Sequence, residues 1–225
     1  MSATVVERQP GGERRGVLVI ACGALAHEIV ALTRANAWDS LEVRCLPPEL
    51  HNRPHLIPEA VEREIRAHAD RYRSVFVAYG DCGTGGRLDA VLEAEGIERL
   101  PGAHCYEAFA TAKVFAELAE AEPGTFYLTD FLLRHFDRLV RRGLGLDRHP
   151  ELAPQYFGNY RRLVYLAQMR ADESTLERAR SIAASLNLEF EHRFTGYGEL
   201  ATSLARALER GARRAPREEL LAWPS

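Results

Sequence analysis

The chain has 225 residues, of which 46% are hydrophobic and 27% are charged, and its formal net charge is −3. This composition is typical of a globular protein with a large core and excludes a disordered or collagen-like chain. The small acidic excess favours no nucleic-acid partner. The longest apolar runs are much shorter than the ~20 residues that cross a bilayer, so no membrane span is expected.

The chain is expected to be cytoplasmic. Residues 1–15 are polar and carry Glu and Arg where a secretory signal would have an apolar core. The cytoplasm keeps thiols reduced, so the four cysteines are expected to be core residues, ligands or nucleophiles and not disulfides.

Short apolar runs alternate with amphipathic segments along the chain. In chain order, strands are predicted at 16–21, 41–46, 74–79, 97–100, 125–129, 162–167 and 188–194. A helix is predicted after each strand, ending at 32 and then covering 59–73, 88–95, 106–120, 131–141, 174–186 and 200–210. This alternation predicts right-handed crossovers in an α/β, three-layer Rossmann-like fold with a mostly parallel sheet of about seven strands.

The predicted organisation is a single α/β domain over 16–210, with mobile tails at 1–15 and 211–225. Residues 143–159 have no clear period, and an irregular segment of that length is often functional. Its aromatic residues Tyr156, Phe157 and Tyr160 either stack on a ligand or anchor the loop to the body of the protein.

Three cysteines follow predicted strands. Cys22 ends the first strand, Cys82 follows the third, and Cys105 lies just beyond the fourth. Ligands bind at the carboxyl ends of parallel strands, so these thiols are predicted to meet at one edge as a zinc or iron–sulfur site. The spacing has no Cys-x-x-Cys pair, and buried structural thiols remain an equal alternative. Cys45, within the second strand, is interpreted as a core thiol.

Other polar residues approach the same predicted edge. His51 follows the second strand, and His104 and Glu107 flank Cys105, so all three are candidate ligands or catalytic proton carriers. Asp81 either orients a ligand or caps the next helix. Thr129 and Asp130 end the fifth predicted strand at the same edge, where an N-cap for the next helix is at least as good an explanation as a role in the site.

The glycines at 83, 85 and 86 are candidates for binding a phosphate-bearing cofactor. Successive glycines let backbone amides approach an anion, so Gly83, Gly85 and Gly86 fit a phosphate cradle. The run has neither the Lys-Ser/Thr pair of a P-loop nor the Rossmann spacing, and tight strand-to-helix turns are the alternative.

Several motifs occur in order along residues 17–198, at 21–24, 81–86, 102–107, 123–131, 143–150 and 156–160. Together they resemble the family of bacterial and archaeal domains of unknown function numbered 1638. The resemblance implies a shared site that includes Cys22, Cys82, His104 and Cys105. Family members are often encoded near corrinoid methyltransferases, which implies a place in corrinoid-linked one-carbon, methylamine or betaine metabolism.

Three hypotheses follow. The first is a metal centre that handles a small-molecule substrate, where zinc with an open position would lower the pKa of a bound water or thiol, or a cluster would leave one iron free. The second is a non-catalytic accessory protein that binds a corrinoid, a corrinoid protein or a methyltransferase. The third has core thiols and a pocket for an unrelated ligand. Whether the protein is an enzyme stays open.

Overall fold

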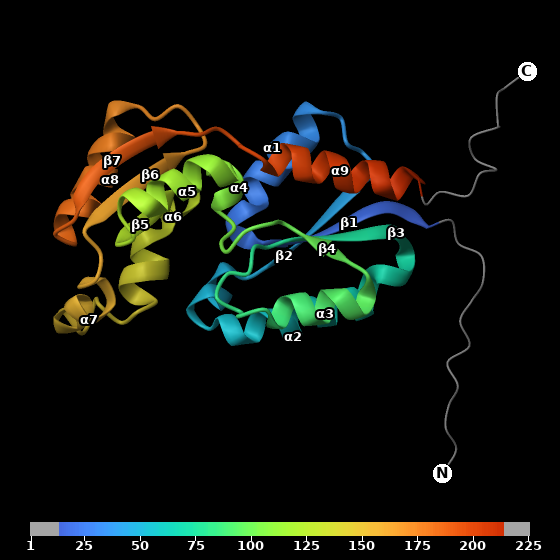
Figure 1. Cartoon of the computed structure of the whole chain (residues 1–225), viewed down its shortest axis with the longest axis horizontal. Coiled ribbons are helices and arrows are strands. Elements are labelled where there is room, and N and C mark those ends of the chain that lie inside the picture. Colours follow the sequence, from blue (N-terminus) through green and yellow to red (C-terminus); the bar gives the residue numbers. More distant parts are fainter. Residues whose placement is uncertain (1–13, 214–225) are drawn as a thin grey trace, which may run out of the picture.

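A computed structural model describes residues 14–213 and shows two parallel β-sheets with helices on their faces (Figure 1). The predicted α/β class with parallel strands is confirmed. The elements of the first sheet and its covering helices are β1 (Arg15–Cys22), α1 (Ala26–Ala35), β2 (Leu41–Leu46), α2 (Ile57–His68), β3 (Tyr72–Ala78), α3 (Arg87–Glu95), β4 (Glu98–Arg99) and α9 (Leu200–Arg213). The remaining elements are α4 (Glu107–Ala110), α5 (Ala112–Ala121), β5 (Thr125–Thr129), α6 (Asp130–Phe136), a π-helix (Asp137–Arg142), α7 (Ala153–Phe157), β6 (Arg162–Ala167), α8 (Glu173–Ser185) and β7 (Glu189–Phe194).

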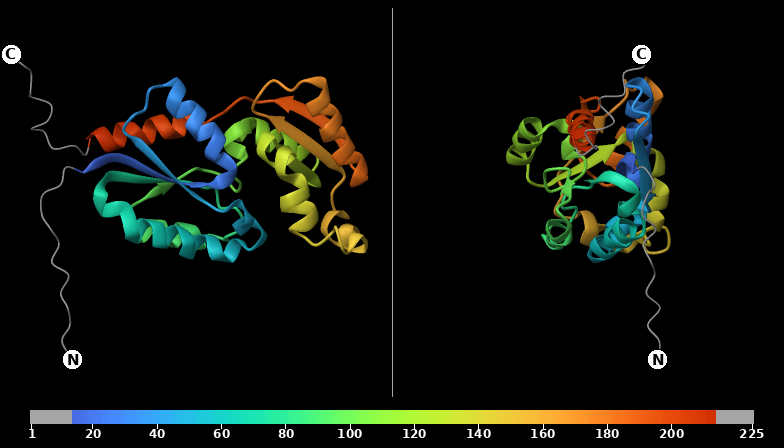
Figure 2. Two further views of the ribbon diagram at one scale, coloured as in Figure 1. Left: turned by 180° about the vertical axis from the view of Figure 1, so that it is seen from behind. Right: turned by 90° about the vertical axis from the view of Figure 1, so that its right-hand side faces the viewer.

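The first sheet has the strand order β2-β1-β3-β4, and all its pairings are parallel. β1 lies between two neighbours, which explains its continuous apolar sequence: residues 18–22 are fully buried. Helices α1 and α9 cover one face, and α2 and α3 cover the other (Figures 1 and 2). The result is a three-layer arrangement around one hydrophobic core.

The second sheet has the order β5-β6-β7 and is also parallel. Its central strand, β6, is apolar on both faces. Leu163, Tyr165 and Ala167 join a core with residues of α6 and α8, whereas Val164 and Leu166 pack on the opposite side with Leu118 of α5. Alternate residues of one strand thus belong to different cores, as expected of a sheet covered on both faces.

The start of α6 confirms the N-cap interpretation of Thr129. Its Oγ1 accepts a hydrogen bond from the amide of Leu132 at 3.3 Å. The buried carboxylate of Asp130 accepts hydrogen bonds from the hydroxyl of Tyr165 at 2.6 Å and the amide of Met169 at 2.9 Å. Asp130 therefore ties α6 to the end of β6.

The prediction of one sheet of about seven strands is wrong. β4 has only two residues, pairs with β3 alone, and ends the first sheet, while β5 pairs with β6. The predicted helix at 106–120 is divided at Thr111, whose φ of +65° is incompatible with a continuing helix. This break lies between the last strand of the first sheet and the first strand of the second.

The last helix returns to the first sheet. α9 packs on β1, β3 and α1, so the chain passes between the two sheets twice. The single domain over 16–210 stays a prediction. Most of the predicted tails, 1–13 and 214–225, lies outside the described residues, but Arg15 opens β1 and 211–213 continue α9.

Gly211 shows how closely α9 packs. A Cβ atom at this position would lie 2.6 Å from Cγ2 of Val17 and 2.9 Å from Oγ of Ser74. We expect Gly211→Leu to lower the free energy of unfolding by about 1–3 kcal/mol, because an added side chain must displace β1 or β3. Urea unfolding measures this change.

The matched control is Ala212→Leu, at an exposed position of the same helix, where we expect a change within about 0.5 kcal/mol. Equal stability of the two variants would contradict the packing of α9 on the first sheet.

Candidate functional site

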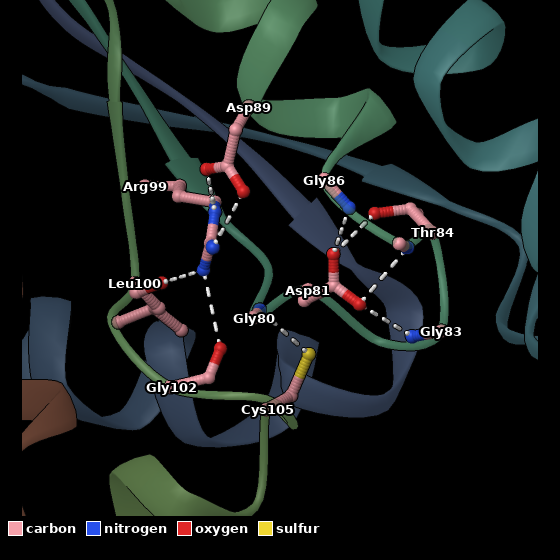
Figure 3. A network of polar contacts seen from close by, with 11 residues as sticks. Gly80, Asp81, Gly83, Thr84, Gly86, Asp89, Arg99, Leu100, Gly102 and Cys105 are labelled. Carbon is pink, nitrogen blue, oxygen red and sulfur yellow. Dashed lines mark hydrogen bonds and ion pairs between the residues drawn. The ribbon is translucent and has the colours of Figure 1, made fainter.

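The three thiols predicted to meet at the carboxyl end of the first sheet all line one pocket there, and two of them are in direct contact. The Sγ atoms of Cys82 and Cys105 lie 3.0 Å apart, and both residues are buried. Cys82 follows β3 and Cys105 follows β4, so neighbouring strands deliver the two sulfur atoms. The amide of Gly80 donates to Sγ of Cys105 at 3.4 Å (Figure 3).

Backbone hydrogen bonds align the two loops that carry these cysteines. The amide of Asp81 donates to the carbonyl of Gly102 at 3.0 Å, and the amide of Cys82 donates to the carbonyl of Ala103 at 2.7 Å. Gly80 makes this approach possible, because a Cβ atom there would lie 2.8 Å from the carbonyl carbon of His104. These bonds join the two loops beyond the ends of β3 and β4, where the two thiols lie side by side.

Asp81 shapes the turn that presents Cys82 (Figure 3). Its carboxylate accepts hydrogen bonds from the amides of Gly83, Gly85 and Gly86 at 3.2, 3.2 and 2.9 Å, and from the hydroxyl of Thr84 at 2.8 Å. The bond from Gly86 contributes most to lowering the pKa of Asp81 to about 2. Asp81 therefore stabilises the turn that precedes α3, although the N-cap residue of this helix is Gly86 and has no side-chain cap.

The three glycines donate their amides to a carboxylate of the protein itself. Gly83, Gly85 and Gly86 all have positive φ, so each occupies backbone conformations that glycine adopts most easily. The turn alternative accounts for all three positions. Phosphate binding at these glycines stays a prediction, and it would require the anion to replace Asp81.

Arg99 secures the second loop (Figure 3). Its guanidinium donates to both carboxylate oxygens of Asp89 in α3, at 2.6 and 2.9 Å. The remaining nitrogen donates to the carbonyls of Leu100 and Gly102 at 2.7 and 3.2 Å. This planar, bidentate group therefore links α3 to the segment that leads into Cys105.

His51 and Cys22 complete the sulfur-rich edge. His51 lies in a short 3-10 turn, Pro48–Asn52, after β2, and its Nδ1 is 3.7 Å from Sγ of Cys22 at the end of β1. Its ring stacks on the buried ring of Tyr79, with 6.0 Å between centroids. One ligand atom each from His51, Cys82 and Cys105 lies within 4.8 Å of the others. Cys22, predicted as a ligand, lies beside His51 and outside this group.

The electrostatics of His51, Cys82 and Cys105 favour a negative charge on one cysteine and a positive charge on the histidine. Burial lowers the pKa of His51, but hydrogen bonds to Cys22 and Cys82 outweigh it and raise the pKa to about 11. The hydrogen bond from Cys105 is the largest effect on Cys82, and with His51 it overcomes burial and lowers the pKa to about 5. The same hydrogen bond and complete burial raise the pKa of Cys105. Without a metal ion, a thiolate at Cys82 is thus stabilised beside an imidazolium.

The two predicted proton carriers near Cys105 have different surroundings. The carboxylate of Glu107 accepts hydrogen bonds from the amides of Ala103 and His104, at 2.8 and 3.1 Å, and so stabilises the loop before α4. His104 is half-buried, stacks on Tyr106 with 4.9 Å between centroids, and lines the pocket described below. His104 is therefore available to a ligand, whereas Glu107 is already engaged.

Cys45, interpreted from the sequence as a core thiol, does not lie in the core. β2 is an edge strand of the first sheet, and the side chain of Cys45 is exposed. The prediction was wrong because an apolar-looking strand was assumed to be covered on both faces.

A pocket of about 430 Å³ opens beside the thiols. Its walls come from both sheets: the loops after β1, β2, β3 and β4 on one side, and β5, α6, the π-helix and α7 on the other. The predicted loop aromatics Tyr156, Phe157 and Tyr160 line it. Phe157 and Tyr160 also make edge-to-face contacts with Phe126, at 5.5 and 5.7 Å. The anchoring alternative is therefore confirmed, and stacking on a ligand stays a prediction for the same residues, which line the cavity.

Some lining residues gave no signal in the sequence. Leu139 and Val140 reach the pocket from the π-helix, and Leu144 reaches it from two residues beyond the end of that helix. Their apolar pattern is that of any buried helix face, and only the second sheet's position directs it toward the cysteines. A larger groove of about 890 Å³ between β3, β4 and α9 contains none of the predicted site residues.

Residues 45–204 match the family model described as "Protein of unknown function (DUF1638)". The chain belongs to the DUF1638 family. The matched residues include His51, Cys82, His104 and Cys105, whereas Cys22 precedes them. No curated protein and no solved structure matches the chain. Among the described helices of this DUF1638 protein, none has the length and apolar character needed to span a membrane.

The hydrogen bonds of Asp81 generate a prediction about stability and pH. We expect Asp81→Ala to lower the free energy of unfolding near pH 7 by about 0.5–2 kcal/mol, the range for a lost capping carboxylate. The pKa is depressed in the folded state, so this stabilisation is complete above the unfolded value of about 3.9 and is lost as the pH falls toward 2. Unfolding of the unsubstituted protein and of Asp81→Ala at pH 7, 4 and 3 measures how the difference between their free energies of unfolding decreases.

The control is Asp147→Ala, which removes an exposed carboxylate elsewhere. A stability difference for Asp81→Ala that stays constant from pH 7 to 3 would show that the carboxylate does not hold this turn.

Proposed function

We propose that the protein binds one thiophilic metal ion, zinc, through His51, Cys82 and Cys105. The observation that carries this proposal is the convergence of one imidazole and two thiols, from three separate segments, within 4.8 Å. Thiolate and imidazole are the donors that zinc takes in proteins. Arg99, Asp81 and Gly80 hold the cysteine loops in position, so the two thiols lie side by side without an ion and need to separate only slightly to bind one tetrahedral zinc.

A single ion suits these distances better than a four-iron cluster. In a four-iron cluster each thiolate binds its own iron atom, so the cysteine sulfur atoms lie farther apart than two ligands of one ion, whereas in a two-iron cluster two cysteines share an iron. The sulfur atoms of Cys82 and Cys105 are only 3.0 Å apart, and the third ligand is an imidazole. These distances favour a single ion over a four-iron cluster, and we propose zinc.

The surroundings of His51 support a role as ligand. Its Nδ1 lies 3.2 Å from the carbonyl oxygen of Pro48. A ligating histidine usually donates its second N–H to a carbonyl, which fixes the tautomer and leaves the other nitrogen's lone pair for the metal. Pro48 provides that acceptor within the same short turn.

Three protein ligands leave one position of a tetrahedral zinc ion open. Closed structural zinc sites have four protein ligands, whereas sites that act on a substrate keep one position for water or substrate. Here the ligands line the pocket of about 430 Å³, which gives an exogenous molecule access. Zinc in this position would lower the pKa of a bound water or thiol, and we propose that the site acts on a small molecule in this way.

The place of this site in metabolism rests on the family resemblance. We extend the proposal to corrinoid-linked one-carbon metabolism, with a corrinoid protein or methyltransferase as partner and the cytoplasm as location. The alternative is an accessory protein that binds such a partner without turnover. Pull-down against the neighbouring gene products, with metal-loaded and metal-free protein, separates them: the accessory function predicts equal capture from both.

Metal analysis tests the site itself. Protein prepared without oxygen and with reductant, because such close thiols readily form a disulfide, is expected to hold about one zinc ion per chain. Cys82→Ser and Cys105→Ser are expected to weaken zinc binding at least about tenfold, since each removes a first-sphere sulfur. Elemental analysis and competition with a chromophoric chelator measure stoichiometry and affinity.

Cys45→Ser is the matched control, because it removes an exposed thiol from the same sheet. It should bind zinc like the unsubstituted protein. Unchanged zinc binding by Cys82→Ser and Cys105→Ser would refute the proposed ligands, and broad visible absorption with iron and sulfide in the protein would establish the cluster instead.

A further inference from the structure

We propose that the pocket binds a small hydrophobic thiol, whose sulfur takes the open metal position and whose uncharged body fills the pocket. This inference rests on the proposed zinc site and adds the chemical class of its ligand. Two observations carry it, namely the soft donor group at the base of the pocket and the composition of the walls.

The walls of the pocket are mainly apolar, and His104, Asn52 and Thr129 are the polar residues among them besides the cysteines, His51 and the tyrosine hydroxyls. Aromatic rings come from both sheets, and aliphatic side chains complete the lining. The aromatic lining residues are Tyr106, Phe109, Phe126, Tyr127, Phe131, Tyr156, Phe157 and Tyr160. Among the described residues that line the pocket, none is Asp, Glu, Lys or Arg. A site of this composition binds by apolar contact and stacking.

The absence of charged side chains from this lining selects against charged ligands. A carboxylate, phosphate or ammonium group in the pocket would lose its hydration without gaining an ionic partner, which is costly. An apolar body instead gains the free energy of removing its surface and that of the rings from water. The pocket's volume of about 430 Å³ accommodates a molecule with one ring or a branched chain.

The donor group at the base explains why the ligand's polar atom should be sulfur. Zinc with two thiolates and one neutral imidazole carries no net charge, and a site rich in sulfur is suited to a further soft ligand. A thiol that bound there would displace the water held at the open position and form one zinc–sulfur bond, and its S–H proton would pass to the solvent buffer. An alcohol of the same shape keeps its proton at neutral pH and is the weaker ligand.

Binding measurements on Co(II)-loaded protein test this class of ligand. Cobalt replaces zinc in tetrahedral sites and makes sulfur coordination visible by absorption. Benzyl mercaptan is the apolar thiol, benzyl alcohol lacks the sulfur, and thioglycolate is a thiol with a negative charge. We expect benzyl mercaptan to change the cobalt spectrum and to bind at least about tenfold more tightly than either of the others.

Substitutions at the exposed rim separate pocket binding from simple coordination. Tyr156 and Tyr160 line the pocket and are 45% and 36% exposed, so their replacement leaves the core intact. Tyr156→Ala combined with Tyr160→Ala is expected to weaken benzyl mercaptan at least about threefold, because apolar contact is lost. Tyr156→Arg should strengthen thioglycolate binding. Phe194→Ala, at a 55% exposed aromatic of β7 outside this pocket, is the matched control and should change neither.

The outcomes distinguish this inference from the proposed site. If the protein binds no cobalt or zinc, both fail. If it binds the ion but thioglycolate or benzyl alcohol equals benzyl mercaptan, the zinc site stands and the ligand class is wrong. Equal loss of benzyl mercaptan binding in Phe194→Ala and the double tyrosine variant would likewise overturn the assignment to this pocket.

Discussion

The candidate site depends on the backbone pairing between the loop after β3 and the loop after β4. Two hydrogen bonds, from the amide of Asp81 to the carbonyl of Gly102 and from the amide of Cys82 to the carbonyl of Ala103, join the two loops beyond the last paired residues of the strands, Val77 and Arg99. These bonds hold the loops together where the thiols of Cys82 and Cys105 lie 3.0 Å apart. The carboxylate of Asp81 accepts, and the guanidinium of Arg99 donates, further hydrogen bonds within these loops. The bonds that stabilise the loops therefore also set the positions of the two thiols.

The two-sheet architecture explains why this edge faces a pocket. β4 is too short to continue the first sheet, and the chain leaves it through α4 and α5 to build a second sheet. α9 then returns to the first sheet, which anchors both ends of the second sheet's segment. The sulfur group contributed by the first sheet and the aromatic rings of both sheets therefore line the same cavity, and the chemistry at its base differs from that of its walls.

Much of this arrangement could be predicted from strand positions. Cys82 and Cys105 follow apolar runs, and the rule that ligands bind at the carboxyl ends of parallel strands placed them together. The break of the sheet could not be predicted, because the short run at 97–100 has the apolar character of a strand but pairs over two residues only. Cys45 was misplaced for a related reason, since strand order, and hence which strand is an edge, is not encoded locally.

The roles of polar side chains were predicted less well than their positions. Asp81 and Glu107 lie beside the cysteines, but both carboxylates are engaged by backbone amides of their own loops. Sequence proximity cannot separate a carboxylate that binds a ligand from one that stabilises a turn, because both functions use the same oxygen atoms. The turn at Pro48–Asn52 places His51 in the compact group with Cys82 and Cys105, whereas Cys22, which lines the same pocket, stays a predicted ligand.

X-ray absorption of the zinc-loaded protein identifies the atoms bound to the ion and therefore tests the proposed ligands. We expect two sulfur atoms at about 2.3 Å and nitrogen at about 2.0–2.1 Å, with one further ligand. Loss of one sulfur from this shell is expected in Cys105→Ser. A shell of nitrogen and oxygen alone, or one unchanged by that substitution, would contradict a zinc site built from His51, Cys82 and Cys105.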